Sequence, residues 1–246
     1  MALAERAYSQ GPSDYRQRFS YRPVRQWSVT TWLIVINVAV FLVDQMTDGT
    51  LTRYGLFSAD TAIFHLQIWR FISSEFLHAG IKHLFFNMFS LYFFGPVLES
   101  YLGRAKFLVF YLLCGIGGAL GYLLLLGAHV LHDGPYTGLI GASGAIMGVL
   151  IGVAVTAPNL SVMLIIPPIP MRMRTMAAIF LFIAVLWIVF AGPNAGGEAA
   201  HLGGAGTGYL LIKNIRWLDW LDPQRWKRRR SQFWKPGDPA DRFFRR

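Results

Sequence analysis

The feature that most constrains the fold of this 246-residue chain is a series of six apolar runs separated by short polar segments. A membrane-spanning helix needs about 20 predominantly apolar residues. The fourth and sixth runs look short for a span, so we expect their ends to meet polar loops or a water-filled cavity inside the membrane. The pattern predicts an all-α membrane protein with six transmembrane helices, at about residues 28–43, 82–98, 105–126, 141–157, 175–191 and 199–212.

The composition agrees with lipid as the main solvent of the chain. Hydrophobic residues make up 54% of the sequence and charged residues only 15%, a balance too apolar for one soluble domain with a polar surface. The net charge of +10 could suggest nucleic acid, but the Lys and Arg residues flank the apolar runs and crowd both termini. We therefore expect membrane lipids as partners and no nucleic acid. The single cysteine, Cys114, allows neither an intrachain disulfide nor a cysteine-based metal site, and we expect no cofactor.

The positive charges predict an orientation. Arg104 with Lys106, and Arg172 with Arg174, fall between the apolar runs on the same side as the two basic termini. The loops on the other side, 127–140 and 192–199, contain no Lys or Arg. Cytoplasmic loops carry the excess of Lys and Arg, so we expect a multi-pass protein with both termini in the cytoplasm. No transit peptide is obvious, and we expect a bacterial plasma (inner) membrane.

Three regions outside the spans complete the predicted organisation. Residues 1–27 are polar and Arg-bearing and predict a disordered cytoplasmic tail, followed by a six-helix membrane domain over 28–213. Residues 44–80 mix apolar and polar positions without a run long enough to span, so we expect a long first loop on the membrane surface. Residues 214–246 interleave Trp with Lys and Arg, which is typical of a cytoplasmic tail at an anionic lipid surface.

Polar side chains inside apolar segments are costly and need an explanation. His83 and Asn87 are four residues apart, so they lie on one face of the second predicted helix. Two such donors could stabilise the oxyanion of a carbonyl under attack. From this pair alone, hydrogen bonding to a neighbouring helix is the simpler interpretation.

Ser143 lies in the segment Gly-Ala-Ser-Gly, residues 141–144, which opens the fourth apolar run. Backbone N–H groups at a helix start lack partners within the helix and point toward an incoming oxyanion. Small neighbours also leave room for a substrate backbone. The position suits a nucleophile, although Gly and Ser commonly begin membrane helices.

Glycines recur every four residues after Ser143 and again after His201, which allows two helix backbones to approach closely. If these faces pack, Ser143 and His201 lie at similar depth and could hydrogen-bond, with the imidazole as the base of a serine hydrolase. No Asp or Glu is expected in an adjacent span at that depth, so we expect a dyad and not a triad. The two stripes comprise Gly144, Gly148 and Gly152, and Gly204 and Gly208.

Taken in order, these residues resemble the rhomboid family over about residues 29–213. The resemblance rests on Trp69-Arg70, Phe76-Leu77-His78, His83, Asn87, Gly141-Ala142-Ser143-Gly144, and Ala200-His201-Leu202-Gly203-Gly204 with Gly208. It implies a six-helix rhomboid-like bundle that cleaves the transmembrane segments of membrane protein substrates, without metal or cofactor. It further implies Ser143 as nucleophile, His201 as general base, His78 as a structural residue, and His83, Asn87 and the Ser143 backbone N–H as the oxyanion hole.

One position departs from the family pattern, and two other classes of protein stay open. Met147 stands where family members often carry an aromatic residue stacked on the base, so we expect a less firmly oriented His201 ring. A catalytically silent rhomboid-like protein that binds membrane proteins is the main alternative, although no catalytic residue is missing. A transporter or channel lined by His83, Asn87 and His201 is the other. A metalloprotease is disfavoured because H-E-x-x-H does not occur.

Overall fold

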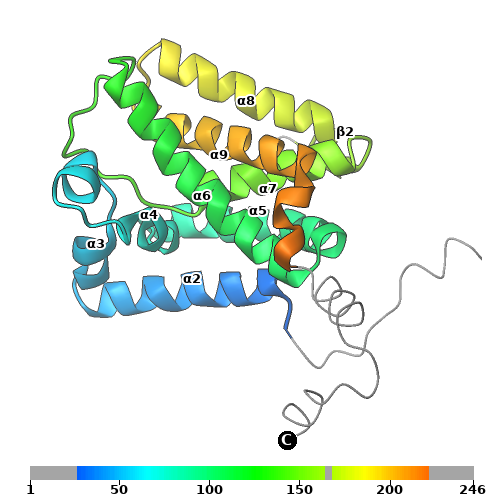
Figure 1. Ribbon diagram of the computed structural model, residues 1–246, viewed down its shortest axis with the longest axis horizontal. Helices are drawn as coiled ribbons and strands as arrows, with labels where there is room; N and C mark the ends of the chain where they lie inside the picture. Colours follow the sequence, from blue (N-terminus) through cyan, green and yellow to red (C-terminus); the bar gives the residue numbers. More distant parts are fainter. Residues whose placement is uncertain (1–26, 164–167, 222–246) are drawn as a thin grey trace, which may run out of the picture.

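The computed structural model describes residues 27–163 and 168–221 and is mostly helical. Every one of the six apolar runs forms a helix, as predicted (Figure 1). The expected disordered tail and the basic part of the C-terminal tail beyond residue 221 lie outside the described residues. The six long helices are α2 (Val29–Met46), α5 (Ile81–Leu102), α6 (Arg104–Gly127), α7 (Ser143–Thr156), α8 (Met173–Val189) and α9 (Ala195–Lys213).

The lengths of the helices agree only in part with the sequence. Helix α7 is short, with 14 residues, as expected. Helix α9 was expected to be short and has 19 residues, because it begins at Ala195 in a Gly-rich stretch that disfavours helix in isolation. In the described part of the chain, α2 and α6 are long and apolar enough to cross a membrane, while α7 and α8 are shorter apolar helices.

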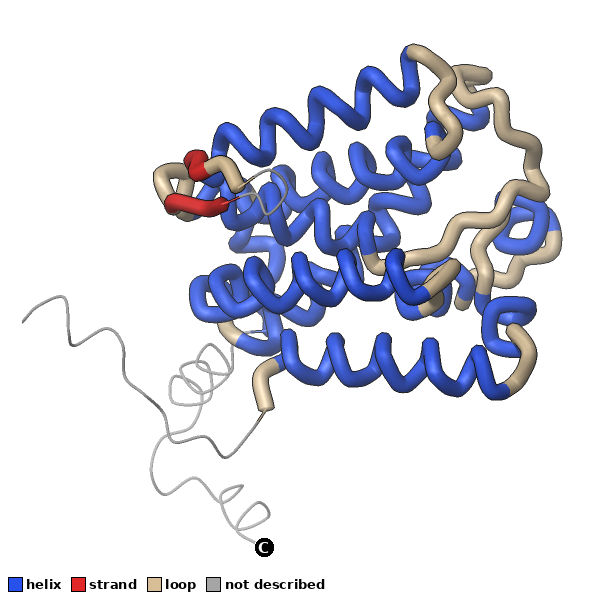
Figure 2. The backbone as a smooth tube through the Cα atoms, turned by 180° about the vertical axis from the view of Figure 1, so that it is seen from behind, coloured by secondary structure: helices blue, strands red, loops and turns tan. Residues whose placement is uncertain are grey.

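Helix α9 lies at the centre of the bundle. It packs against α6, α7 and α8, while α2 packs on α5 and α5 contacts α7 (Figure 1). A long loop, residues 128–142, runs back from the end of α6 to the start of α7 (Figure 2). The start of α7 therefore lies inside the bundle, beside the N-terminal half of α9.

Glycine backbones make the contact between α7 and α9. A Cβ atom on Gly204 would overlap the carbonyl group of Gly144, and one on Gly208 would lie 2.6 Å from the carbonyl oxygen of Gly148. The predicted pairing of the two glycine stripes is thus confirmed for these two levels. Gly152 differs, since it faces the side chain of Leu98.

A second set of small residues, on α6, was not predicted. A Cβ on Gly121 would lie 2.6 Å from the Cα of Gly203, and one on Gly118 would lie 2.9 Å from the carbonyl oxygen of Ala200. Helix α9 is therefore held closely on two sides. The spacing of glycines in the sequence did not predict that α6 packs against α9.

The first loop is folded into short helices: α3 (Thr50–Gly55), a π-helix (Asp60–Phe64), α4 (Arg70–Ser73) and a 3₁₀ turn (Ser74–Phe76). Arg70 is buried in it and donates to the carbonyl oxygens of Arg53, at 3.3 Å, and Leu56, at 2.5 Å. A buried guanidinium that bonds several carbonyl groups fixes the path of the chain around it. The placement of this loop at a membrane surface stays a prediction.

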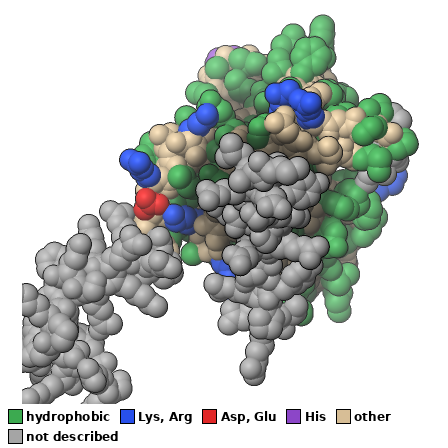
Figure 3. Space-filling view, turned by 90° about the vertical axis from the view of Figure 1, so that its right-hand side faces the viewer, with side chains coloured by type: hydrophobic (Ala, Val, Ile, Leu, Met, Phe, Trp, Pro, Cys, Tyr) green, Lys and Arg blue, Asp and Glu red, His purple; other side chains and the backbone are tan. Residues whose placement is uncertain are grey.

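The ends of the helices agree with the predicted grouping of basic residues. One end of the bundle holds the α5–α6 junction, the α7–α8 connection, the start of α2 and the end of α9 (Figure 1). Lys and Arg side chains are exposed at this end (Figure 3). The α7–α8 connection includes a hairpin of β1 (Ser161–Met163) and β2 (Pro170–Arg172). After α9, a 3₁₀ segment (Ile215–Leu221) is tied to α6 by Lys106 and Asp219, 2.8 Å apart.

The close contact between α7 and α9 predicts that Gly204→Ala is destabilising. The new methyl group must displace the backbone of α7, and overpacking of this kind costs about 1–3 kcal/mol. The matched control is Gly206→Ala on the same helix, where a Cβ would meet nothing within 4 Å. We expect Gly206→Ala to leave stability unchanged or raise it by up to about 1 kcal/mol. Thermal unfolding in detergent measures both, and equal melting temperatures for the two variants would contradict the packing described.

Candidate active site

Ser143 is the first residue of α7, and the loop before it is held by backbone hydrogen bonds. Gly141 donates its N–H to the carbonyl oxygen of Ser74 at 2.9 Å, and Leu139 donates to that of Phe57 at 2.8 Å. The N-cap residue Ala142 offers no side-chain cap. The first backbone N–H groups of α7 are therefore available to another acceptor.

His83 and Asn87 converge on Gly141, two residues before Ser143. The backbone of Gly141 has φ +125°, a conformation that L side chains rarely adopt. A Cβ there would lie 2.7 Å from His83 Nε2 and 3.8 Å from Asn87 Nδ2. The predicted common face of these two side chains is confirmed, and it is directed at the chain that leads into Ser143.

Both side chains have a donor free to act at this point. The N–H of Ala79 donates to His83 Nδ1 at 3.4 Å, which leaves the ring proton on Nε2. Asn87 is 6% exposed, and its Nδ2 has no hydrogen-bond partner among the described residues. Two N–H donors beside the start of a helix form an arrangement able to stabilise an oxyanion.

His78, expected to be structural, packs against His83. Their ring centroids are 5.1 Å apart with an interplanar angle of 62°. Burial, and then the neighbouring His83, lower the pKa of His78 to about 4. A neutral, buried ring at this place supports the orientation of His83.

His201 lies near the start of α9 and has a carboxylate partner. Its Nδ1 is 2.9 Å from Glu198 Oε2, and the two side chains are only 19% and 18% exposed. The sequence predicted no Asp or Glu in an adjacent span at this depth, and Glu198 instead lies on the same helix as His201. Residues 192–199 were expected to form a loop, whereas α9 begins at Ala195 and brings the i, i+3 pair onto one face.

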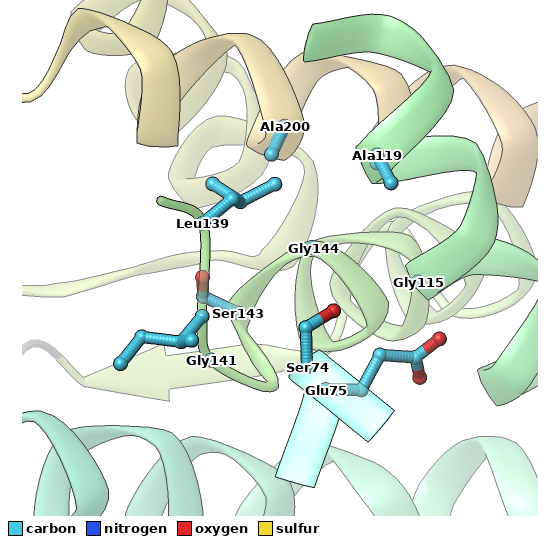
Figure 4. A pocket seen from close by; sticks show the side chains of 11 residues that line it. Ser74, Glu75, Gly115, Ala119, Leu139, Gly141, Ser143, Gly144 and Ala200 are labelled. Carbon is cyan, nitrogen blue, oxygen red and sulfur yellow. The ribbon is translucent and has the colours of Figure 1, made fainter. Parts of the chain in front are cut away.

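The first turn of α7 lies against α9 at the level of His201. Ser143 and Ala200, the neighbour of His201, line one small cavity (Figure 4). Among the hydrogen bonds of the described residues, none involves the Ser143 hydroxyl, so the direct bond to His201 that the sequence suggested is not formed here. Catalytic hydrogen bonds are often long without substrate and tighten when it binds.

The cavity also holds a residue that the sequence did not single out. Its volume is about 20 Å³, enough for a water molecule. Glu75 points across it toward Gly115, where a Cβ would overlap the carboxyl group (Figure 4). Both carboxyl oxygens lack a hydrogen-bond partner in the described part of the chain, and burial raises the pKa of Glu75 well above its usual value. Its position in an apparent surface loop gave no signal of this burial.

The raised pKa of Glu75 predicts a pH-dependent effect of Glu75→Gln. The folded protein keeps the carboxyl proton to a higher pH than the unfolded chain, so this group favours folding below about pH 4.5 and opposes it increasingly as the pH rises. A neutral amide removes that dependence. We expect Glu75→Gln to raise the melting temperature relative to the unsubstituted protein more at pH 8 than at pH 5.

Glu99→Gln is the control for this experiment. The Glu99 carboxylate accepts three hydrogen bonds at the start of α2, from Val29 N–H and from the N–H and hydroxyl of Thr30, at 2.7–2.9 Å. Replacing an acceptor in such a network is destabilising. If Glu75→Gln lowered the melting temperature equally at both pH values, the description of Glu75 as a buried, unpaired acid would be wrong.

Comparison with known proteins identifies the class to which this fold and site belong. Residues 65–217 match the family model for the Rhomboid domain, which covers more than half of the chain. The protein therefore belongs to the rhomboid family, a membrane-embedded family, and the resemblance drawn from the sequence is confirmed.

Individual relatives include several bacterial proteins. The chain is 32% identical to the putative rhomboid protease YdcA of Bacillus subtilis (strain 168), over 51% of this chain and 60% of that protein. It is 29% identical to the rhomboid protease AarA of Providencia stuartii, over 80% of this chain and 74% of that protein. It is 30% identical to the rhomboid protease GlpG of Yersinia pestis (strain Pestoides F), over 54% of this chain and 46% of that protein. The chain thus spans less than two thirds of the length of YdcA and GlpG.

Proposed function

We propose that this protein is an intramembrane serine endopeptidase that cleaves transmembrane segments of membrane proteins. The observation that carries the proposal is the convergence of His83 and Asn87 on Gly141, beside the start of α7 at Ser143. The contact of α7 with α9, which brings in His201, and the membership of the rhomboid family support it.

The roles of the residues follow from their chemistry. Ser143 Oγ attacks the scissile carbonyl carbon while its proton passes to His201 Nε2. The carbonyl oxygen becomes an oxyanion that accepts hydrogen bonds from His83 Nε2, Asn87 Nδ2 and the Ser143 backbone N–H. His201 then returns the proton to the leaving amine as the C–N bond breaks. A water molecule then gives its proton to His201 and attacks the acyl carbon. The ester bond to Ser143 breaks, and His201 returns the proton to Ser143 Oγ. The mechanism uses no metal and no cofactor.

The membrane topology is part of the same proposal. The six helices α2, α5, α6, α7, α8 and α9 span a bacterial plasma membrane, with α7 kept short because its start meets the polar interior of the site. The basic end of the bundle and both termini lie in the cytoplasm. The six-helix domain, residues 28–213, contacts lipid.

A catalytically silent rhomboid-like protein is the second candidate. Among the hydrogen bonds of the described residues none involves the Ser143 hydroxyl, which favours this candidate, since an unactivated serine reacts slowly. The two functions make opposite predictions for cleavage of a substrate, and one assay separates them.

The dyad and the oxyanion hole are tested with purified protein and a single-span model substrate in liposomes. Ser143→Ala and His201→Ala are expected to abolish cleavage. Asn87→Ala removes one oxyanion donor and should lower kcat by about 10²–10³-fold. Gel analysis and mass spectrometry of the fragments measure the rates.

Ser90→Ala is the matched control for Asn87→Ala. Ser90 lies three residues on along α5, and its hydroxyl donates to the carbonyl oxygen of Phe86 at 2.8 Å, within the helix. We expect an unchanged kcat. Absence of cleavage by the unsubstituted protein on several substrates, together with no labelling of Ser143 by a serine-directed phosphonate, would favour the silent protein instead.

A further inference from the structure

The hydrogen bond between Glu198 and His201 has no place in a two-residue mechanism. The carboxylate oxygen Oε2 lies 2.9 Å from the ring nitrogen Nδ1. Both side chains are more than four-fifths buried, so water competes weakly for this bond. The two residues are three apart on α9, which keeps them together as long as the helix is formed.

A purely structural role would not require this contact. Glu198 lies in the first turn of α9, where any carboxylate interacts favourably with the helix dipole. The interaction with the helix dipole does not depend on whether the Glu198 side chain reaches the imidazole of His201. The observed hydrogen bond adds two things, a fixed orientation of the ring and a fixed tautomer.

We infer that Glu198 is a positioning residue for His201, so that the site works as a Ser143–His201–Glu198 triad. This inference rests on the proposed proteolytic function. With its proton held on Nδ1 by Glu198, the ring presents the lone pair of Nε2, the atom that must accept the Ser143 proton. The sequence alone suggested a dyad because Glu198 was placed in a loop.

Glu198 acts through charge as well as through orientation. When Nε2 takes the proton from Ser143, the ring becomes an imidazolium with an N–H on both nitrogens. The carboxylate then faces a full positive charge at hydrogen-bond distance, and it stabilises that charge without accepting the proton itself. The effect is larger in a buried setting than at a surface, since the local dielectric constant is lower.

The test compares Glu198→Ala and Glu198→Gln with the unsubstituted protein in the liposome assay. Glu198→Ala loses both acceptor and charge and should lower kcat by at least about tenfold, with KM nearly unchanged, because a general base contributes about 10²–10⁴-fold. Glu198→Gln keeps an oxygen that can accept from Nδ1 and should retain an intermediate kcat. Both variants lose the same charge at the start of α9, so the difference between them reports the hydrogen bond.

The described part of the chain offers a matched control in a second histidine–carboxylate pair. Asp60 Oδ2 lies 3.4 Å from His65 Nδ1 in the first loop, where the histidine side chain is 62% exposed. Asp60→Asn removes a carboxylate from a histidine without touching α9. We expect it to leave kcat and KM unchanged.

Nitrogen-15 NMR of histidine-labelled protein gives a readout that does not depend on activity. The His201 signals, assigned by their loss in His201→Ala, should report a proton on Nδ1 in the unsubstituted protein and in Glu198→Gln. In Glu198→Ala they should report a mixture of tautomers, while Asp60→Asn leaves them unchanged.

The outcomes separate the inference from the proposed function. An active protein whose kcat is unaffected by Glu198→Ala overturns the triad. A His201 tautomer that is the same in Glu198→Ala also overturns it, whether or not the protein cleaves substrate. If no substrate is cleaved and Ser143 is not labelled, the proposed function fails, and the NMR comparison still decides whether Glu198 positions the ring.

Discussion

The close backbone contact of α9 with α7 and α6 is the constraint on which the rest of the structure depends. Gly204 and Gly208 lie against the backbones of Gly144 and Gly148, so the two helices are in direct backbone contact at these two levels. Without hydrophobic driving force in lipid, helices associate through such packing and through the small residues that permit it. The contact fixes the depth of α7 relative to α9, and so the first turn of α7 lies beside the turn that carries His201. Any larger side chain at these positions would separate the two halves of the site.

A second dependence links the site to the first loop. The chain before Ser143 is bonded to Ser74 and Phe57, and the loop that supplies those residues is held by the buried Arg70. Gly141, with its positive φ, then lets this chain lie against His83. The proposed oxyanion donors are thus placed by α5, by the loop before α7 and by the first loop together. Because these segments are far apart in sequence, the site forms only when the whole bundle has folded.

Much of this arrangement could be predicted from the sequence. The six helices follow from apolar runs, the common face of His83 and Asn87 from their spacing of four, and the pairing of α7 with α9 from the glycine period. What the sequence did not reveal depends on tertiary context. The folded first loop is stabilised by carbonyl contacts of Arg70, which leave no periodic pattern. The burial of Glu75 depends on the missing side chain of Gly115, on a different helix.

The start of α9, next to His201, could not be predicted from the sequence either. A Gly-rich stretch has low helix propensity, so residues 192–199 were expected to form a loop and Glu198 escaped notice. Packing against α6 and α7 overrides that propensity and extends the helix back to Ala195. An i, i+3 search upstream of His201 would have found the pair. The expectation that Met147 leaves the His201 ring less firmly oriented stays a prediction, and the ring has a hydrogen-bond partner in Glu198.

The central claim is that Ser143 and His201 act together on the same scissile bond, and a bifunctional inhibitor tests it most directly. A 4-chloroisocoumarin is opened by an attacking serine and then alkylates a histidine within reach. Mass spectrometry of the digested protein should find one adduct that joins the peptide of Ser143 to the peptide of His201. An adduct on either residue alone, or a bridge from Ser143 to a different histidine, would contradict the account.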